Sequence, residues 1–164
     1  MTSSELTRLA MKLKDKGLTI AFAESITGGM LASEFIKAKG TSDVLLGSIV
    51  TYAEEVKQKV LGVKKQTLKL YTAESQQVTN EMVMGLYKLL KAEVCIAVTG
   101  LGGVGASESK EKPVGTIFVS ILFKNRVEEF REELKGNSAN IRKNAADFIF
   151  RKLEDTIGRH FEHE

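Results

Sequence analysis

Three polar segments contain residue types that could do chemistry, and each follows a stretch typical of a buried strand. They are Ala23–Gly29 (AESITGG), Thr51–Lys57 (TYAEEVK) and Thr99–Gly105 (TGLGGVG). In open α/β sheets, ligands bind outside the carboxyl ends of the strands. Because all three segments would lie at such ends, we expect them to share one site.

Ser25 is the candidate nucleophile of the first segment. It lies between a predicted strand and a predicted helix start, where free N–H groups can bind a phosphate or a developing oxyanion. Gly28 and Gly29 allow a ligand to approach the backbone closely. A second interpretation is that Ser25 or Thr27 only caps the helix, and this segment taken alone favours the cap.

A serine nucleophile needs a base, and histidine is a poor candidate here. The two histidines, His160 and His163, both lie in the last five residues, so a Ser-His-Asp triad is not expected. A lysine can act as base if burial lowers its pKa. Lys57 is one candidate, with a solvated helix residue as the alternative. Tyr52 could donate a hydrogen bond, or it could simply pack.

The third segment also matches a dinucleotide-binding pattern. Gly100–Gly105 reads G-x-G-x-x-G, but that fingerprint requires a helix to begin there. The following residues are polar and run through Pro113 into a strand, so we expect a loop over a ligand. Cys95 lies among apolar residues and is expected in the core. No His, Cys or carboxylate spacing indicates a metal site, and we expect no metal and no organic cofactor.

The composition is that of one ordinary domain covering residues 1–164. Hydrophobic residues make up 43% of the chain and the net charge is only +3, with basic and acidic residues interleaved. We therefore expect no nucleic-acid partner. No apolar run reaches the roughly 20 residues of a membrane span, and the charged N-terminus is unlike a signal peptide. With a single cysteine, these features favour a cytoplasmic protein.

Periodicity predicts alternating helices and buried strands, and hence an α/β fold. Val127–Leu134, which follows Asn125, should pair with the preceding strand as an antiparallel hairpin at one sheet edge, which makes the sheet mixed. Expected helices are a first one capped by Thr2 and Glu5 and ended by Gly17, then Thr27–Lys37, Glu54–Leu61, a turn or helix over Lys64–Leu70, Glu74–Lys91 and Ser138–Gly158. Expected strands are Leu18–Ala23, Val44–Tyr52, Val94–Val98, Val114–Phe123 and Val127–Leu134.

Four motifs in the same order resemble one known family. Ala23–Gly29 resembles the AES-C-TGG signature of the CinA C-terminal domain family, which includes stand-alone nicotinamide-nucleotide amidases. Gly47–Val63 resembles its G-x-V-x-Y-S-N-E-x-K-x-x-x-L-G-V segment. Ala97–Gly103 is similar to its TGIAGP loop, and Lys112–Ile121 to its KPVGTV strand. Together the motifs span nearly the whole chain, which makes the resemblance specific.

The resemblance implies a three-layer α/β/α domain that hydrolyses the amide of nicotinamide mononucleotide. Ser25 matches the family's nucleophile, and Tyr52 and Lys57 match its tyrosine and lysine. Substrate contacts are expected from Thr27, Gly28, Gly29, Thr99, Gly100 and Gly102. The expected partner is a small nucleotide substrate, and we expect a homo-oligomer, a dimer or larger.

Several positions depart from the family pattern. Ile26 replaces a cysteine, Ala53-Glu54 replaces Ser-Asn, and Gly103-Val104 replaces Gly-Pro. A segment usually near Ala-Val-Ser reads Ala73-Glu74-Ser75. Glu54 would bring a negative charge near a phosphorylated substrate. These departures leave an alternative open, namely a catalytically degenerate relative that binds a nucleotide or regulates a partner.

Overall fold

The computed structural model, which describes residues 1–161, contains one five-stranded sheet with the strand order β2-β1-β3-β4-β5. Strands β2, β1 and β3 are parallel, whereas β4 runs antiparallel to β3 and β5 antiparallel to β4. The sheet is therefore mixed, with the predicted hairpin at one edge. The strands are β1 (Ile20–Glu24), β2 (Leu45–Val50), β3 (Val94–Gly100), β4 (Thr116–Phe123) and β5 (Arg126–Glu133).

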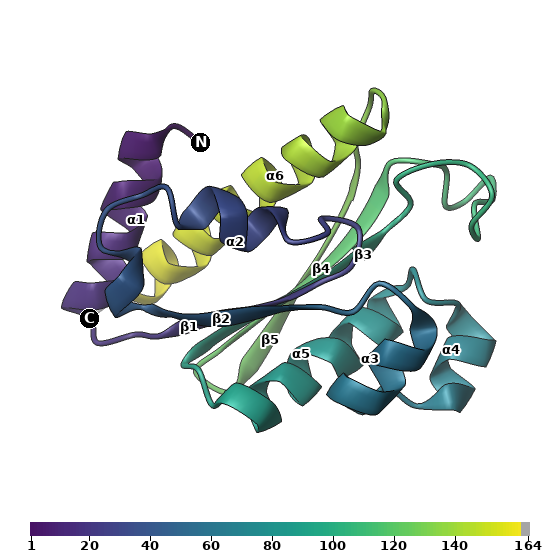
Figure 1. The fold of residues 1–164 in the computed structure, drawn as a ribbon, viewed down its shortest axis with the longest axis horizontal. Coiled ribbons are helices and arrows are strands. Elements are labelled where there is room, and N and C mark those ends of the chain that lie inside the picture. Colours follow the sequence, from purple (N-terminus) through teal and green to yellow (C-terminus); the bar gives the residue numbers. More distant parts are fainter. Residues whose placement is uncertain (162–164) are drawn as a thin grey trace.

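Helices cover both faces of this sheet, which gives the expected α/β/α layering (Figure 1). Helices α1, α2 and α6 pack on one face, and α3, α4 and α5 pack on the other (Figure 1). The helices are α1 (Ser3–Asp15), α2 (Met30–Phe35), α3 (Glu54–Leu61), α4 (Lys65–Tyr71), α5 (Gln76–Leu90) and α6 (Ser138–Phe161), with a short 3₁₀ turn η1 at Thr41–Asp43. Within residues 1–161, no helix combines the length and apolarity that crossing a bilayer requires.

The two faces of the central strands carry side chains of different size. In β1, Ile20 and Phe22 join the core under α1, α2 and α6, whereas Ala21 and Ala23 join the core under α5. This is the period-two alternation of a strand. The small side chains on the second face allow α5 to pack close to the sheet, which in turn sets the position of the helices beside it.

Local sequence features explain several element ends. Thr2 and Glu5 form a reciprocal capping box at the start of α1, as predicted. Lys124 and Asn125 both have positive φ, 51° and 61°, which is the geometry of a two-residue hairpin turn. These features confirm the capped first helix and the β4–β5 hairpin.

The start of α2 differs from the prediction. The helix was expected from Thr27, but it begins at Met30 because Gly28 and Gly29 adopt left-handed conformations with φ of 58° and 101°. The segment after β1 is therefore a turn that leads into a short helix. The carboxyl ends of β1, β2 and β3 meet at one edge, since Glu24 pairs with Val50 and Ala23 pairs with Ala97.

Candidate functional site

Ser25 and Lys57 meet at this edge of the sheet. Ser25 directly follows β1, and Lys57 lies on α3, which follows β2. The Lys57 Nζ lies 2.9 Å from the Ser25 Oγ, and the lysine is only 1% exposed. A solvated lysine, the alternative considered from the sequence, is therefore wrong. The structure places the two side chains where one could pass a proton to the other.

Within residues 1–161, the Lys57 Nζ has two further hydrogen-bond partners, and both are backbone carbonyls. Its Nζ donates to the Thr51 carbonyl at 2.6 Å and to the Tyr52 carbonyl at 3.1 Å. A neutral amine has two N–H bonds and one lone pair. Because carbonyls only accept hydrogen bonds, they take both N–H groups of a neutral Lys57, which leaves the lone pair directed at the Ser25 hydroxyl. This is the arrangement that a general base requires.

The electrostatic surroundings favour that neutral form. Burial lowers the pKa of Lys57, and the negative charges of Glu74 and Glu54 oppose part of this lowering. Removal of an ammonium group from water disfavours its charged form. No carboxylate of residues 1–161 forms a salt bridge with Lys57, so no ion pair holds the amine in its charged form.

The position of Lys57 depends on the close packing of α3 against α5. A Cβ atom added at Gly85 of α5 would lie 1.9 Å from the Leu61 carbonyl oxygen, at the end of α3. Only glycine allows this approach. Leu61 is one helical turn beyond Lys57, so Gly85 helps to set where the lysine side chain enters the site.

The turn that carries Ser25 is organised by Glu24, not by a serine or threonine cap. The Glu24 carboxylate accepts hydrogen bonds from the N–H groups of Gly29, Leu31 and Ala32, at 3.0, 3.0 and 3.1 Å. The N-cap of α2 is Gly29, which has no side-chain cap. The expectation that Ser25 or Thr27 caps the helix is therefore wrong. Those three N–H groups are also not free to bind a phosphate or an oxyanion.

The other predicted residues of the first segment lie in this turn. Thr27 is buried and its hydroxyl donates to the Glu24 carboxylate at 2.6 Å. The Gly28 N–H bonds to the Ser25 carbonyl at 3.1 Å. The predicted substrate contacts of Thr27, Gly28 and Gly29 remain predictions.

Tyr52 lies beside the pair but turns its phenol outward. Its side chain is 77% exposed, and it contacts Lys57 through its backbone carbonyl. Among residues 1–161, the phenol has no hydrogen bond to either Ser25 or Lys57. A role for the phenol in orienting or relaying the proton stays a prediction, whereas the carbonyl of Tyr52 already orients the amine.

The third predicted segment forms the opposite wall. Thr99 is buried and shares a hydrogen bond of 2.9 Å with the Thr79 hydroxyl of α5. A Cβ on Gly100 would lie 2.8 Å from the Thr116 carbonyl oxygen, so the glycine permits a tight exit from β3. No helix begins within Gly100–Gly105, as a dinucleotide-binding turn would require. As predicted, residues 101–115 form a loop.

A hollow of about 310 Å³ opens between this loop and the serine turn. We call it the glycine-loop hollow. Its lining is Ile26, Tyr52, Gly102, Gly103, Val104, Gly105, Ala106, Ser138 and Arg142. Arg142 gives it a cation and Ser138 a hydroxyl, both from the start of α6. Sequence reasoning missed these two residues, because they lie more than 80 positions after Lys57 and no spacing connects them to it.

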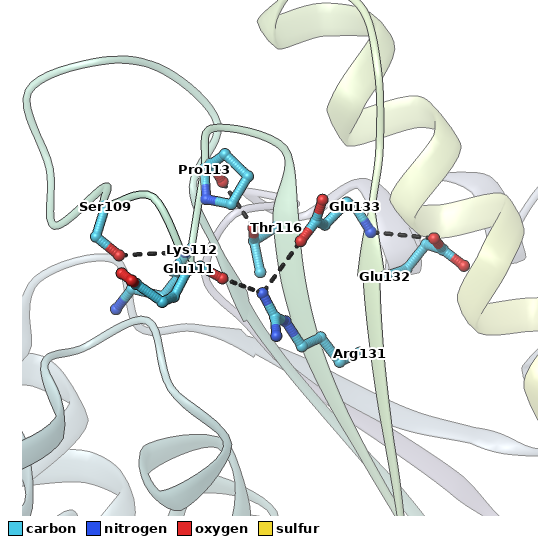
Figure 2. Close-up of polar contacts among 8 residues, drawn as sticks. All are labelled: Ser109, Glu111, Lys112, Pro113, Thr116, Arg131, Glu132 and Glu133. Carbon is cyan, nitrogen blue, oxygen red and sulfur yellow. Dashed lines mark hydrogen bonds and ion pairs between the residues drawn. The ribbon is translucent and has the colours of Figure 1, made fainter.

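Residues 107–112, in the second half of the loop 101–115, form hydrogen bonds on two sides. On one side, the Ser107 hydroxyl donates to the Glu74 carboxylate at 2.5 Å, and the Lys112 Nζ donates to the Thr72 hydroxyl at 2.7 Å. On the other side, Arg131 of β5 donates to the Glu111 carbonyl (Figure 2). The Lys112 N–H also bonds to the Ser109 hydroxyl at 3.1 Å (Figure 2). These contacts fix the loop beside the serine–lysine pair.

Three of the residues that depart from the family pattern lie in different parts of the site. Ile26 is buried in the core and its side chain lies beside Gly100 and Gly102. Glu54 is the first residue of α3, where a negative charge is favourable to the helix dipole. Val104 is 88% exposed on the loop. None of them takes a hydrogen-bonding partner away from Ser25 or Lys57.

The described residues contain no candidate metal centre beside the pair. In residues 1–161, no three His, Cys, Asp or Glu side chains are grouped so that they could hold a metal ion. Cys95 lies buried in β3, and burial raises the pKa of its thiol to about 12. His160 lies on α6 beside Phe123, and His163 lies outside the described residues. The chemical groups gathered at the site are a serine hydroxyl and a buried lysine amine.

Comparison with known proteins places the chain in a family. The model of the CinA C-terminal domain matches residues 3–157. A CinA-like protein of Fusobacterium nucleatum is 45% identical over 135 residues, which cover 82% of this chain and 32% of that protein. A CinA-like protein of Thermotoga neapolitana is 42% identical, with 86% of this chain and 34% of that protein covered. The chain thus spans about a third of the length of these curated relatives.

Solved structures agree with this assignment. The crystal structure of a competence-damaged protein (CinA) superfamily protein from Klebsiella pneumoniae has a TM-score of 0.91 at 29% identity, covering 97% of this chain and 99% of that one. One from Escherichia coli has a TM-score of 0.86 at 31% identity, covering 91% and 86%. The α/β/α fold found here is the fold of those proteins.

Proposed function

The chain belongs to the CinA C-terminal domain family, and on that basis we propose that it is an amidohydrolase that deamidates nicotinamide mononucleotide to nicotinate mononucleotide and ammonia. The observation that carries the proposal is the 2.9 Å contact between the buried Lys57 amine and the Ser25 hydroxyl. A serine is a weak nucleophile until an adjacent base takes its proton. Lys57, with its lowered pKa, is suited to that role.

In the proposed first half-reaction, Ser25 Oγ attacks the carboxamide carbon while its proton passes to the lone pair of Lys57. The carbonyl oxygen becomes an oxyanion. The hydrogen bonds within residues 1–161 leave the N–H groups of Ile26 and Thr27 without an acceptor, and these would stabilise that charge. Lys57 then returns its proton to the amide nitrogen, the C–N bond breaks, and ammonia leaves.

The second half-reaction reverses the roles of the same groups. Lys57 takes a proton from water, and the hydroxide attacks the nicotinoyl ester on Ser25. The ester C–O bond breaks, Ser25 recovers its proton from Lys57, and nicotinate mononucleotide is released. The carbonyls of Thr51 and Tyr52 hold the amine in place throughout. The scheme requires no metal ion or organic cofactor.

We propose that the glycine-loop hollow holds the remainder of the substrate. Arg142 offers the bidentate cation that phosphate prefers, and the exposed Tyr52 adds an aromatic ring to the lining. The pyridinium ring of the substrate is cationic, and such rings bind well to aromatic faces. We infer that the phosphate lies toward Arg142 and the carboxamide toward Ser25.

The direct test is ammonia release from nicotinamide mononucleotide by the purified protein, with and without a chelator. We expect turnover that the chelator leaves unchanged. The Lys57→Ala variant should lose that turnover, whereas Lys59→Ala, which removes an exposed lysine of the same helix, should keep it. Activity that disappears in chelator and returns with zinc would refute the serine mechanism. Binding of the nucleotide without turnover would favour the degenerate relative.

A further inference from the structure

Glu24 is a carboxylate buried completely at the end of an apolar strand. Its side chain is 0% exposed, and within residues 1–161 it has no cationic partner. Instead it accepts five hydrogen bonds. The donors are the hydroxyls of Thr27 and Ser48, at 2.6 and 2.7 Å, and the N–H groups of Gly29, Leu31 and Ala32, at 3.0, 3.0 and 3.1 Å.

These five bonds connect three elements across the position of Ser25. Ser48 belongs to β2, Leu31 and Ala32 belong to α2, and Gly29 ends the turn between β1 and α2. Ser25 itself is the residue next to Glu24 and begins that turn. A side chain that fixes both flanks of the turn also fixes the serine between them.

We propose that Glu24 is a positioning residue that holds the Ser25 hydroxyl against the Lys57 amine. It acts through the backbone of the turn and touches neither the amine nor the substrate. An effect of Glu24 on catalysis rests on the proposed function. Its effect on the geometry of the Ser25–Lys57 pair does not depend on that function. With the turn in place, the Ser25 Oγ lies 2.9 Å from an amine whose side chain is only 1% exposed, so we expect a displaced turn to open the amine to water.

Because all five partners of Glu24 are donors, replacing it with glutamine should disturb the turn even though the two side chains have nearly the same size. An ionised carboxylate only accepts hydrogen bonds, whereas the amide of glutamine has one accepting oxygen and a donating NH₂. In Glu24→Gln, the NH₂ must therefore face some of the donors. The Ser48 hydroxyl can rotate and accept, but the Ala32 N–H cannot. The turn must then shift, although the side chain keeps its size.

The test measures the pKa of Lys57 by NMR titration of ¹³C-labelled lysine, with the resonance assigned from Lys57→Met. In Glu24→Gln we expect this pKa to rise toward the ordinary value of about 10.4, because water reaches the amine. Below that pKa, kcat should fall about tenfold for each unit of the rise, with little change in KM. The matched control is Glu93→Gln, because Glu93 also accepts from a threonine N–H and hydroxyl, but at the opposite end of the sheet.

The direction of the shift decides between explanations. Loss of a through-space negative charge alone would lower the pKa of Lys57, and a purely structural role would leave it unchanged in the folded variant. Either result would overturn the proposal. If Glu24→Gln does not fold, Thr27→Val removes one of the five donors while keeping the shape, and the same rise is expected.

The titration needs no substrate, so the two proposals fail separately. A wild-type protein that releases no ammonia, yet shows the rise in Glu24→Gln, would refute the amidase and support the role of Glu24. Full turnover in wild type together with an unchanged pKa in a folded Glu24→Gln would do the reverse.

Discussion

Replacing Gly85 with alanine should push α3, the helix that carries Lys57, away from α5. The new Cβ would lie 1.9 Å from the Leu61 carbonyl oxygen, whereas Cβ atoms essentially never come closer than 3.0 Å to a neighbour. The α3 and α5 backbones must therefore move apart by about 1 Å. A misplacement of that size can lower turnover about 100-fold. Overpacking destabilises by about 1–3 kcal/mol, and the better helix propensity of alanine offsets up to about 1 kcal/mol of this.

The assay combines urea unfolding with the kinetics of ammonia release. Gly47→Ala is the matched control, because a Cβ at Gly47 meets nothing within 4 Å. We expect Gly85→Ala to lose both stability and kcat, and Gly47→Ala to lose little of either. A Gly85→Ala protein with wild-type stability and turnover would show that the α3–α5 contact does not position Lys57.

Three further predictions concern charge and protonation. Glu54→Asn removes a charge that raises the pKa of Lys57, so the rise of kcat with pH should move to lower pH. The KM for a phosphorylated substrate should also fall. An unchanged KM would show that the Glu54 charge does not act on the phosphate. Because the pKa of Lys57 is lowered on folding, the unfolded chain binds more protons between that pKa and about 10.4, and wild-type stability should rise with pH there. Urea unfolding of Lys57→Met should lack this rise, and parallel curves for the two proteins would contradict the buried neutral amine. Cys95, whose pKa is raised to about 12, should react with a thiol reagent at neutral pH only after unfolding, and rapid labelling of the native protein would contradict its burial.

The layers of the fold could be predicted because the sequence patterns are local. Val94–Gly100 is a nearly continuous apolar run, and the 15-residue helix Gln76–Leu90 has apolar residues at helical spacing. Polar segments after parallel strands meet at one edge. That rule predicts that the segments containing Ser25 and Lys57 share a site, and the resemblance to the family singles out Lys57 as the base. Their separation of 2.9 Å depends on packing between helices, such as the contact at Gly85, which no local pattern contains.

Other features of the site could not be predicted from local propensity. Ser25 looked like a helix cap, but two left-handed glycines move the start of α2 to Met30, and a glutamate takes the capping role. A charged residue that ends the apolar strand IAFAE was a visible indication that Glu24 is unusual. Arg142 offered no such indication, because it looks like any exposed residue of a long amphipathic helix.

The most direct test of the serine–lysine mechanism compares ammonia release from nicotinamide mononucleotide in wild type, Ser25→Ala, Lys57→Ala and the double variant. If the serine and lysine act as one unit, each single change should remove most of the turnover, and the double variant should be hardly worse than either, because members of a catalytic unit are not additive. Ser25→Ala should also fold with nearly wild-type stability, since Ser25 does not cap α2. Wild-type turnover that persists undiminished in Ser25→Ala would contradict the serine–lysine mechanism.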